Sequence, residues 1–234
     1  MNKIKYSIIT FPGSNCDHDI EWISQLYDGE SRLIWHKDSD LQNPDIVVLP
    51  GGFSFGDYLR CGALAKYSSI MNEIIKFAKS GGLVLGICNG FQILTEVGLL
   101  PGILLKNKSM KFICKNQHLK VINNNTPFTC DYRKDEVIKV PIAHKDGYFY
   151  ADEPTMNEII KNNQIVFCYS DENGNINDET NPNGSILNIA GITNKEGNVL
   201  GLMPHPERSA ENIMTSTEGS GVFKSIKKWL HERI

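Results

Sequence analysis

This 234-residue sequence lacks the features of a membrane protein, a secreted protein or a nucleic-acid-binding protein. Its longest candidate apolar span centres on residues 83–87, far short of the roughly 20 residues that a membrane helix needs. Residues 1–7 lead directly into a strand-like run and contain no signal-peptide core. The net charge is −3, so no strong basic field attracts nucleic acid. We expect a cytoplasmic protein that binds neither nucleic acid nor a membrane.

The sequence also lacks closely spaced cysteines. Scattered cysteines in a reducing compartment are usually small buried apolar residues, and zinc ligands normally lie closer together in sequence. We therefore expect neither a disulfide framework nor a metal site. The six residues are Cys16, Cys61, Cys88, Cys114, Cys130 and Cys168.

The chain has the composition of an ordinary globular α/β protein, with 41% hydrophobic and 22% charged residues. Its length fits one domain over residues 1–234, since we find no repeat and no linker. Short β-branched runs alternate with segments of helical period, which predicts a mostly parallel central sheet flanked by helices. The first half predicts strands at 6–10, 31–35, 45–49 and 83–87. Ile70, Ile74, Phe77 and Ala78 predict a helix before Gly81.

The second half has shorter intervals between its apolar runs. Such intervals predict antiparallel strands added to the parallel core. The strands are expected at 119–122, 137–140, 165–169, 189–193 and 199–203. Residues 171–184 are rich in Asn, Gly and Asp and predict an exposed loop. A last helix is expected over about 221–233.

One segment combines a strand, a sharp turn and a helix with a reactive residue at the bend. The pattern Gly86-x-Cys88-x-Gly90 matches a nucleophile elbow, whose tight turn leaves no room for neighbouring side chains. The amino end of a helix favours a thiolate and offers backbone N–H donors. Taken alone, the pattern fits a buried core cysteine as well as it fits a nucleophile.

Pro204-His205-Pro206-Glu207 provides a candidate acid/base for this thiol. Proline after His205 favours an extended backbone, on which residues two apart point to the same side. Glu207 can then orient the imidazole, as in a catalytic triad. The alternative is a solvated surface pair. We favour catalysis because both motifs follow apolar strands.

Pro50-Gly51-Gly52 follows the expected strand at 45–49. Adjacent glycines after a strand often only turn the chain. They can also present a backbone N–H to an oxyanion, together with the N–H of Asn89. We favour this second role because of the neighbouring motifs.

These motifs, in this order, resemble those of class I (triad) glutamine amidotransferases, whose central sheet is flavodoxin-like. Longer motifs resemble the glutaminase subunits of phosphoribosylformylglycinamidine synthases, which act in purine biosynthesis. The resemblance covers residues 11–208. The longer motifs are residues 11–17, 52–63, 98–102 and 181–185.

The resemblance implies that the chain hydrolyses glutamine through a cysteine thioester. It implies Cys88, His205 and Glu207 as catalytic residues, Gly52 and Asn89 as oxyanion donors, and Gly51, Gln92 and His144 as substrate contacts. Ammonia would pass to a large ATP-dependent synthetase subunit, which amidates formylglycinamide ribonucleotide, and a small third subunit would assist assembly. This chain would carry no cofactor, since ATP and Mg²⁺ would bind the synthetase.

One departure concerns the loop of His144. The family commonly carries His-Gly-Glu-Gly, whereas this chain has Lys145 and Asp146 at the middle positions. His144 is therefore either a substrate contact or a structural loop residue. Cys16 and Asp17 receive no role from the sequence, and Asp57, Tyr58 and Arg60 are candidates for docking the synthetase or for a solvated loop. Three other functions stay open: another α/β hydrolase with an elbow cysteine, a glutaminase for another synthetase, and a non-catalytic interaction subunit.

Overall fold

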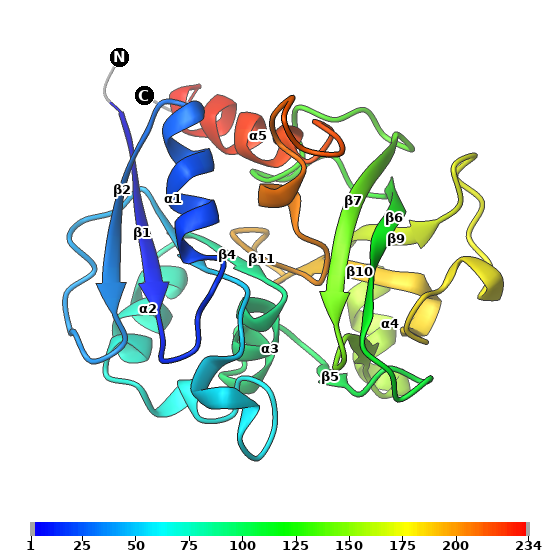
Figure 1. The fold of residues 1–234 in the computed structure, drawn as a ribbon, viewed down its shortest axis with the longest axis horizontal. Coiled ribbons are helices and arrows are strands. Elements are labelled where there is room, and N and C mark those ends of the chain that lie inside the picture. Colours follow the sequence, from blue (N-terminus) through cyan, green and yellow to red (C-terminus); the bar gives the residue numbers. More distant parts are fainter. Residues whose placement is uncertain (1–2, 233–234) are drawn as a thin grey trace.

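A nine-stranded sheet forms the centre of the protein in the computed structural model, which describes residues 3–232 (Figure 1). Its strand order is β2-β1-β3-β4-β11-β10-β9-β6-β7, and β5 pairs with β8 in a separate ribbon. The strands are β1 (Ile4–Thr10), β2 (Gly29–Trp35), β3 (Ile46–Leu49), β4 (Leu83–Ile87), β5 (Ile103–Leu105), β6 (Ile113–Val121), β7 (Val137–His144), β8 (Tyr148–Tyr150), β9 (Ile165–Ser170), β10 (Ile189–Thr193) and β11 (Val199–Leu202).

The first half of the sheet is parallel. β2, β1, β3, β4 and β11 pair in parallel in that order, which is the flavodoxin-like arrangement 2-1-3-4-5. Every residue of β3, β4 and β11 is buried, because helices cover both faces of these strands. The predicted parallel α/β core is therefore confirmed.

The second half of the sheet is antiparallel, as the short intervals predicted. β10 pairs with β11 and β9, while β6 pairs with β9 and β7. β6 and β7 are longer than predicted, since the prediction covered only 119–122 and 137–140. The added residues of β6 include Lys115 and Asn116, exposed polar side chains that interrupt the apolar pattern.

The helices lie over the two faces of the sheet, and α1 and α5 lie beside each other near the two chain ends (Figure 1). The rings of Tyr27 and Phe223 stack between them, with centroids 6.0 Å apart. α5 matches the predicted last helix, whose expected end at Arg233 lies outside the described residues, as do residues 1–2. The helices are α1 (Asp17–Leu26), α2 (Ile70–Lys79), α3 (Asn89–Glu96), α4 (Glu153–Lys161) and α5 (Ser220–His231).

Two helices were absent from the sequence prediction. α4 has a readable start, because Asp152 accepts a hydrogen bond from the Thr155 N–H and Pro154 lies in the first turn. α1 starts at Asp17, and its N-cap residue Cys16 makes no capping hydrogen bond, so only the acidic Asp17 and Asp19 of the first turn signal its start. No helix between residues 3 and 232 combines the length and apolar character that crossing a membrane requires.

The loops after β1, β3, β4 and β11 meet at one edge of the sheet because parallel strands end on the same side. This edge receives residues 11–16, 50–54, 88 and 203–207. Open α/β sheets place their ligand sites at this position. The fold therefore gathers the motifs that the sequence analysis singled out.

Candidate active site

Cys88 occupies a strained turn between β4 and α3. Its φ and ψ are 49° and −102°, outside the regions that side-chain-bearing residues normally adopt. The Cys88 N–H still bonds to the Leu202 carbonyl on β11, and the Cys88 carbonyl accepts from the Gln92 N–H of α3. The turn is thus fixed on both sides and holds the thiol at the edge of the sheet.

The glycines that flank Cys88 are there because the turn has no space for a Cβ. A Cβ on Gly86 would lie 2.8 Å from the carbonyl carbon of Gly90. A Cβ on Gly90 would lie 2.0 Å from the Leu49 carbonyl oxygen at the end of β3. The expected reason for this glycine pattern, which is steric crowding at the elbow, therefore agrees with the structure.

His205 and Glu207 form a buried pair after β11. The His205 Nδ1 lies 2.6 Å from the Glu207 Oε1, and neither side chain is more than 3% exposed. The expected pairing of the two side chains is thus present, whereas the surface-pair alternative disagrees with their burial. The His205 N–H bonds to the Pro141 carbonyl of β7, which anchors this turn to the antiparallel half of the sheet.

The imidazole interacts with two thiols, those of Cys88 and Cys16. Its Nε2 makes no ordinary hydrogen bond to any residue from 3 to 232. The Cys16 Sγ, a ring nitrogen of His205 and a carboxylate oxygen of Glu207 all lie within 4.8 Å of one another. Sequence analysis assigned no role to Cys16, so its place beside the imidazole is a finding of the tertiary structure.

Electrostatics favour a protonated His205. Burial alone lowers the pKa of this imidazole, but the Glu207 carboxylate, Cys88 and Cys16 together raise it well above its ordinary value. A buried imidazolium between a carboxylate and a thiol is the ion-pair arrangement that activates a sulfur nucleophile. The group can therefore store and return a proton next to the elbow.

Two backbone N–H groups of the expected site have no backbone acceptor among the described residues, that of Asn89 directly after Cys88 and that of Gly52 in the loop after β3. Gly52 has a φ of 151°, and a Cβ there would lie 2.8 Å from the Gly13 carbonyl oxygen, so only glycine fits. These are the two donors expected to hold an oxyanion, and both are free in the structure.

The side chains of Asn89 and Gln92 connect the loops around the elbow. The Asn89 Oδ1 accepts from the Ser54 N–H at 3.2 Å, and the Asn89 Nδ2 donates to the Gln92 Oε1 at 2.9 Å. The Gln92 Nε2 then donates to the Asp146 carbonyl at 2.6 Å. In this state Gln92 holds the loop after β7 and keeps a second Nε2–H for another acceptor.

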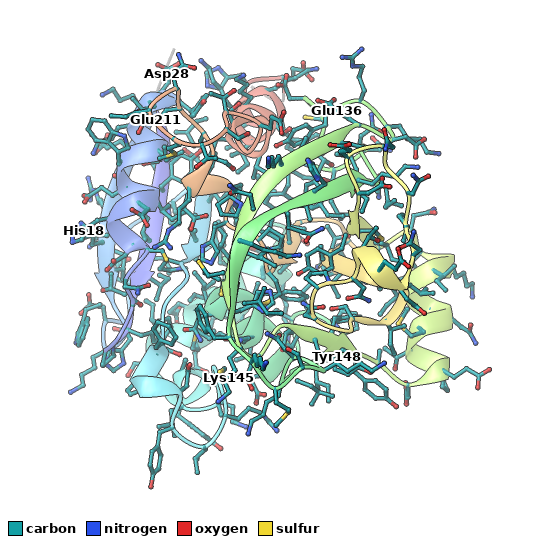
Figure 2. The ribbon with its side chains drawn as sticks, turned by 45° about the vertical axis from the view of Figure 1, so that its right-hand side comes forward. His18, Asp28, Glu136, Lys145, Tyr148 and Glu211 are labelled. Atoms are coloured by element: carbon teal, nitrogen blue, oxygen red, sulfur yellow. The ribbon has the colours of Figure 1, made fainter. Side chains whose placement is uncertain are left out.

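His144 is the last residue of β7, at the start of that same loop, and is buried. The His144 Nδ1 lies 3.1 Å from the Asn107 Oδ1, an acceptor, so this nitrogen carries the proton and Nε2 is left without a partner. Burial is the main reason that the pKa of His144 falls to about 3, and the nearby His205 lowers it further. His144 is thus a neutral ring, and Figure 2 shows the adjacent Lys145 at the end of β7.

Two buried asparagines hold the loop of His144, and sequence reasoning missed this role for both. Asn107 accepts from the Gly147 N–H and donates to the His144 carbonyl. Asn183 donates to the Gly147 carbonyl at 2.7 Å. Asn183 is 1% exposed, so the prediction of an exposed loop over 171–184 is wrong at this residue. The motif at 181–185 was a signal for Asn183, whereas no pattern marked Asn107.

The loop of Asp57, Tyr58 and Arg60 is only partly solvated. Tyr58 is exposed, but the Arg60 Nε lies 2.6 Å from the Glu96 Oε1 on α3. Burial raises the pKa of Asp57, and nearby Asp146 raises it further. Of the three docking candidates, Tyr58 and Arg60 are both exposed to a partner, and Arg60 is also paired with Glu96.

The thiol itself is largely covered. Cys88 is 6% exposed, and its Sγ lies 3.8 Å from the Ala143 carbonyl oxygen of β7. The loops at 53–62 and 144–147 both lie close to the elbow, because Asn89, the residue after Cys88, bonds to Ser54, and Gln92, one turn further along α3, bonds to Asp146. Entry of a substrate as large as an amino acid therefore requires these loops to move.

A flavodoxin-like sheet with an elbow thiol beside a histidine–carboxylate pair is the arrangement of class I glutamine amidotransferases. Residues 3–231 match the family model described as the CobB/CobQ-like glutamine amidotransferase domain. The chain belongs to this family.

Its relatives narrow the class further. The chain is 52% identical over 227 residues to phosphoribosylformylglycinamidine synthase subunit PurQ of Chlorobaculum parvum, covering 97% of this chain and 90% of the relative. It is 53% identical over 221 residues to the subunit PurQ of Synechocystis, covering 94% and 99%. A chain in the structure of PurLQS from Thermotoga maritima is 42% identical, with a TM-score of 0.87 and coverage of 97% and 99%.

Proposed function

We propose that this chain is the glutaminase subunit of a phosphoribosylformylglycinamidine synthase, and that residues 1–234 work as one unit in the cytoplasm. The observation that carries the proposal is sequence identity of 52% and 53% to subunits of that name, over 97% and 94% of this chain. The elbow thiol beside a buried His205–Glu207 pair supports it, because a non-catalytic subunit has no need of a strained cysteine.

The reaction starts at Cys88. Its thiolate attacks the carboxamide carbon of glutamine, and the oxygen of that group becomes an oxyanion. The N–H group of Gly52, in the loop that also contains Gly51, and the N–H group of Asn89 at the start of α3 hold this oxyanion. His205 gives its proton to the departing nitrogen, so ammonia leaves and a glutamyl thioester remains.

The second half of the reaction releases glutamate. His205, now neutral, takes a proton from water, and the resulting hydroxide attacks the thioester carbonyl. The carbon–sulfur bond breaks, glutamate leaves, and the Cys88 thiolate and the His205 imidazolium are restored. Glu207 stabilises the imidazolium at both stages through its 2.6 Å contact. Gln92 and His144 border the glutamine pocket.

The ammonia is used by partner subunits. A large synthetase subunit, which binds ATP and Mg²⁺, uses it to convert formylglycinamide ribonucleotide to the amidine, and a small subunit assists assembly. The similarity to a chain of PurLQS supports these partners. A different synthetase as partner is the remaining alternative, and it is distinguished by which synthetase product forms.

The test is covalent labelling with the glutamine analogue 6-diazo-5-oxo-L-norleucine, followed by peptide mass spectrometry. We expect the label on Cys88 alone among the six cysteines, and loss of both labelling and glutamate release in Cys88→Ala. Cys168→Ala, which removes a buried thiol of β9, is the matched control and keeps both. Label on Cys16, or full glutaminase activity in Cys88→Ala, contradicts the assignment.

A further inference from the structure

Residues 11–17 form a motif whose role the sequence left open. In the structure this segment joins β1 to α1 and lies against the loop of Gly51 and Gly52. The N–H groups of Asn15 and Cys16 both point to the Gly51 carbonyl, at 3.4 and 3.2 Å, and Ser14 pairs with Gly52. The backbone of the motif therefore fixes the loop that presents an oxyanion donor.

The side chain of Cys16 faces the other way, toward His205. A Cβ on Gly51 would lie 3.0 Å from the Cys16 Sγ and 2.7 Å from the His205 Cε1. Gly51 thus leaves just enough space for the thiol and the imidazole to lie side by side. Cys16 is 2% exposed, so solvent does not separate the two groups.

Arg208 connects this thiol to α1. The Arg208 Nη2 donates to the Cys16 Sγ at 3.1 Å, and its Nε donates to the Asp19 Oδ2 at 3.1 Å. Arg208 follows His205 and Glu207 on the same short turn, Pro206–Arg208. The chain of contacts therefore runs from α1, through Arg208 and Cys16, to the imidazole.

Further contacts brace the same segment against α1. The Tyr27 hydroxyl donates to the Ala210 carbonyl at 2.7 Å, and the Trp22 Nε1 donates to the Glu211 Oε1 at 2.9 Å. Figure 2 shows Glu211 near the end of α1. α1 thus acts as the support against which the turn of His205 is set.

The protonation of Cys16 suits a supporting role. Burial raises the pKa of its thiol and Glu207 raises it further, while His205 and Arg208 act in the opposite direction. If Cys16 is a neutral thiol, it does not compete with Cys88 for the proton of the His205 imidazolium. A second thiolate at this place would compete with the elbow for the same proton.

We propose that Cys16 is a positioning residue for His205, and that the Cys16–Arg208–Asp19 chain holds the imidazole in the orientation that serves Cys88. This inference rests on the proposed function, since it concerns the same glutaminase site. It assigns a role to the motif at 11–17, which belongs neither to the Cys88 elbow nor to the triad.

The test uses Cys16→Ala and Cys16→Ser in the complex assembled with the synthetase and the small subunit. We expect kcat for glutamate release to fall about tenfold in Cys16→Ala, equivalent to about 1.4 kcal/mol, while KM for glutamine changes less than about twofold. Cys16→Ser keeps a small polar group beside Arg208 and is expected to recover most of kcat. Cys168→Ala is the matched control.

A second readout separates positioning from general destabilisation. The pH dependence of Cys88 alkylation by iodoacetamide reports the ion pair with His205, and we expect its midpoint to shift in Cys16→Ala but not in Cys168→Ala. Asp19→Asn changes the most exposed residue of the Cys16–Arg208–Asp19 contacts. We expect it to shift the alkylation midpoint in the same direction by a smaller amount, and this variant tests the inference if Cys16→Ala does not fold.

Two results overturn the inference. One is an unchanged kcat and alkylation profile in Cys16→Ala; the other is a lower melting temperature with no change in the profile. Failure of the proposed function is a separate outcome, because it appears as absent glutamine hydrolysis in the unaltered complex.

Discussion

Among single residues of the site, Glu207 decides the protonation state of His205. The fold buries it completely and pairs its Oε1 with the imidazole of His205, while its Oε2 has no hydrogen-bond partner among the described residues. A buried carboxylate with so few partners is costly unless a cation lies beside it. The pair is thus best understood as an imidazolium and a carboxylate.

Glu207→Gln is expected to lower kcat at least tenfold, or about 1.4 kcal/mol in barrier. Because Glu207 raises the pKa of His205, its loss should also move the alkaline fall of kcat/KM to lower pH. The raised pKa means that protonated His205 stabilises the fold below about pH 6.5, and this stabilisation is lost as pH rises through the folded value. An unshifted alkaline limb in a kcat/KM profile contradicts this role for Glu207.

His144 has the opposite pH dependence. With a pKa of about 3 in the folded protein, it stays neutral while the unfolded chain takes up a proton below about pH 6.5. The contribution of neutral His144 to stability is full above that pH and is lost as pH falls toward about 3.

We expect the free energy of unfolding to drop by about 2 kcal/mol from this residue between pH 7.5 and 5, and His144→Asn to remove that drop. Asparagine keeps a donor for Asn107 but does not titrate. Urea unfolding at both pH values checks this, with His118→Asn on β6 as control. An equal loss in wild type and His144→Asn rules the explanation out.

At the scale of elements, β3, β4 and α3 are built around close contact of backbones. Gly90 in the first turn of α3 lies directly against the Leu49 carbonyl at the end of β3. That contact sets the distance between the elbow and the loop of Gly51 and Gly52. The nucleophile and the oxyanion donor are therefore positioned by the same packing.

Gly90→Ala is expected to destabilise the fold by about 3 kcal/mol, because its Cβ would lie 2.0 Å from the Leu49 oxygen. Gly98→Ala is the control: its φ is 72° but a Cβ there meets nothing within 4 Å, so only the backbone strain of about 1 kcal/mol applies. Urea unfolding of both variants compares them. If both variants lose the same free energy of unfolding, the close approach of Gly90 to Leu49 does not contribute to stability.

At the scale of the whole molecule, both halves of the sheet contribute groups and loops to the site around Cys88. β7 supplies the Ala143 carbonyl next to Cys88 and the Pro141 carbonyl that holds His205. The loops that cover the thiol come from both the parallel and the antiparallel half. A partner that touches these loops can therefore control access to Cys88.

We expect the purified chain alone to hydrolyse glutamine weakly, and the synthetase with the small subunit to raise kcat/KM by about tenfold or more, within the usual range of coupling between sites. Cys88 is 6% exposed in the isolated chain, which is the physical reason. Glutamate release measured with and without the partners tests this. High activity without partners contradicts control by loop opening.

Much of the fold followed from the sequence because its signals are local. Apolar runs gave the parallel strands within a few residues, and the glycines around Cys88 predicted a crowded turn that the structure contains. α1 escaped prediction because no capping side chain marks its start. The added part of β6 escaped because pairing with neighbouring strands outweighed its polar composition. The added part of β7 begins at Pro141, a residue that disfavours strands in sequence, yet it pairs with β6 as far as His144.

By itself the sequence determined the class of fold, the elbow and the His205–Glu207 pair, since each depends on residues close together in the chain. Tertiary structure alone decided that Cys16 lies beside the imidazole and accepts a hydrogen bond from Arg208, and that Asn107 and Asn183 hold the loop of His144. These contacts join segments far apart in sequence, and a lone cysteine or asparagine carries no local pattern that reports its distant partner.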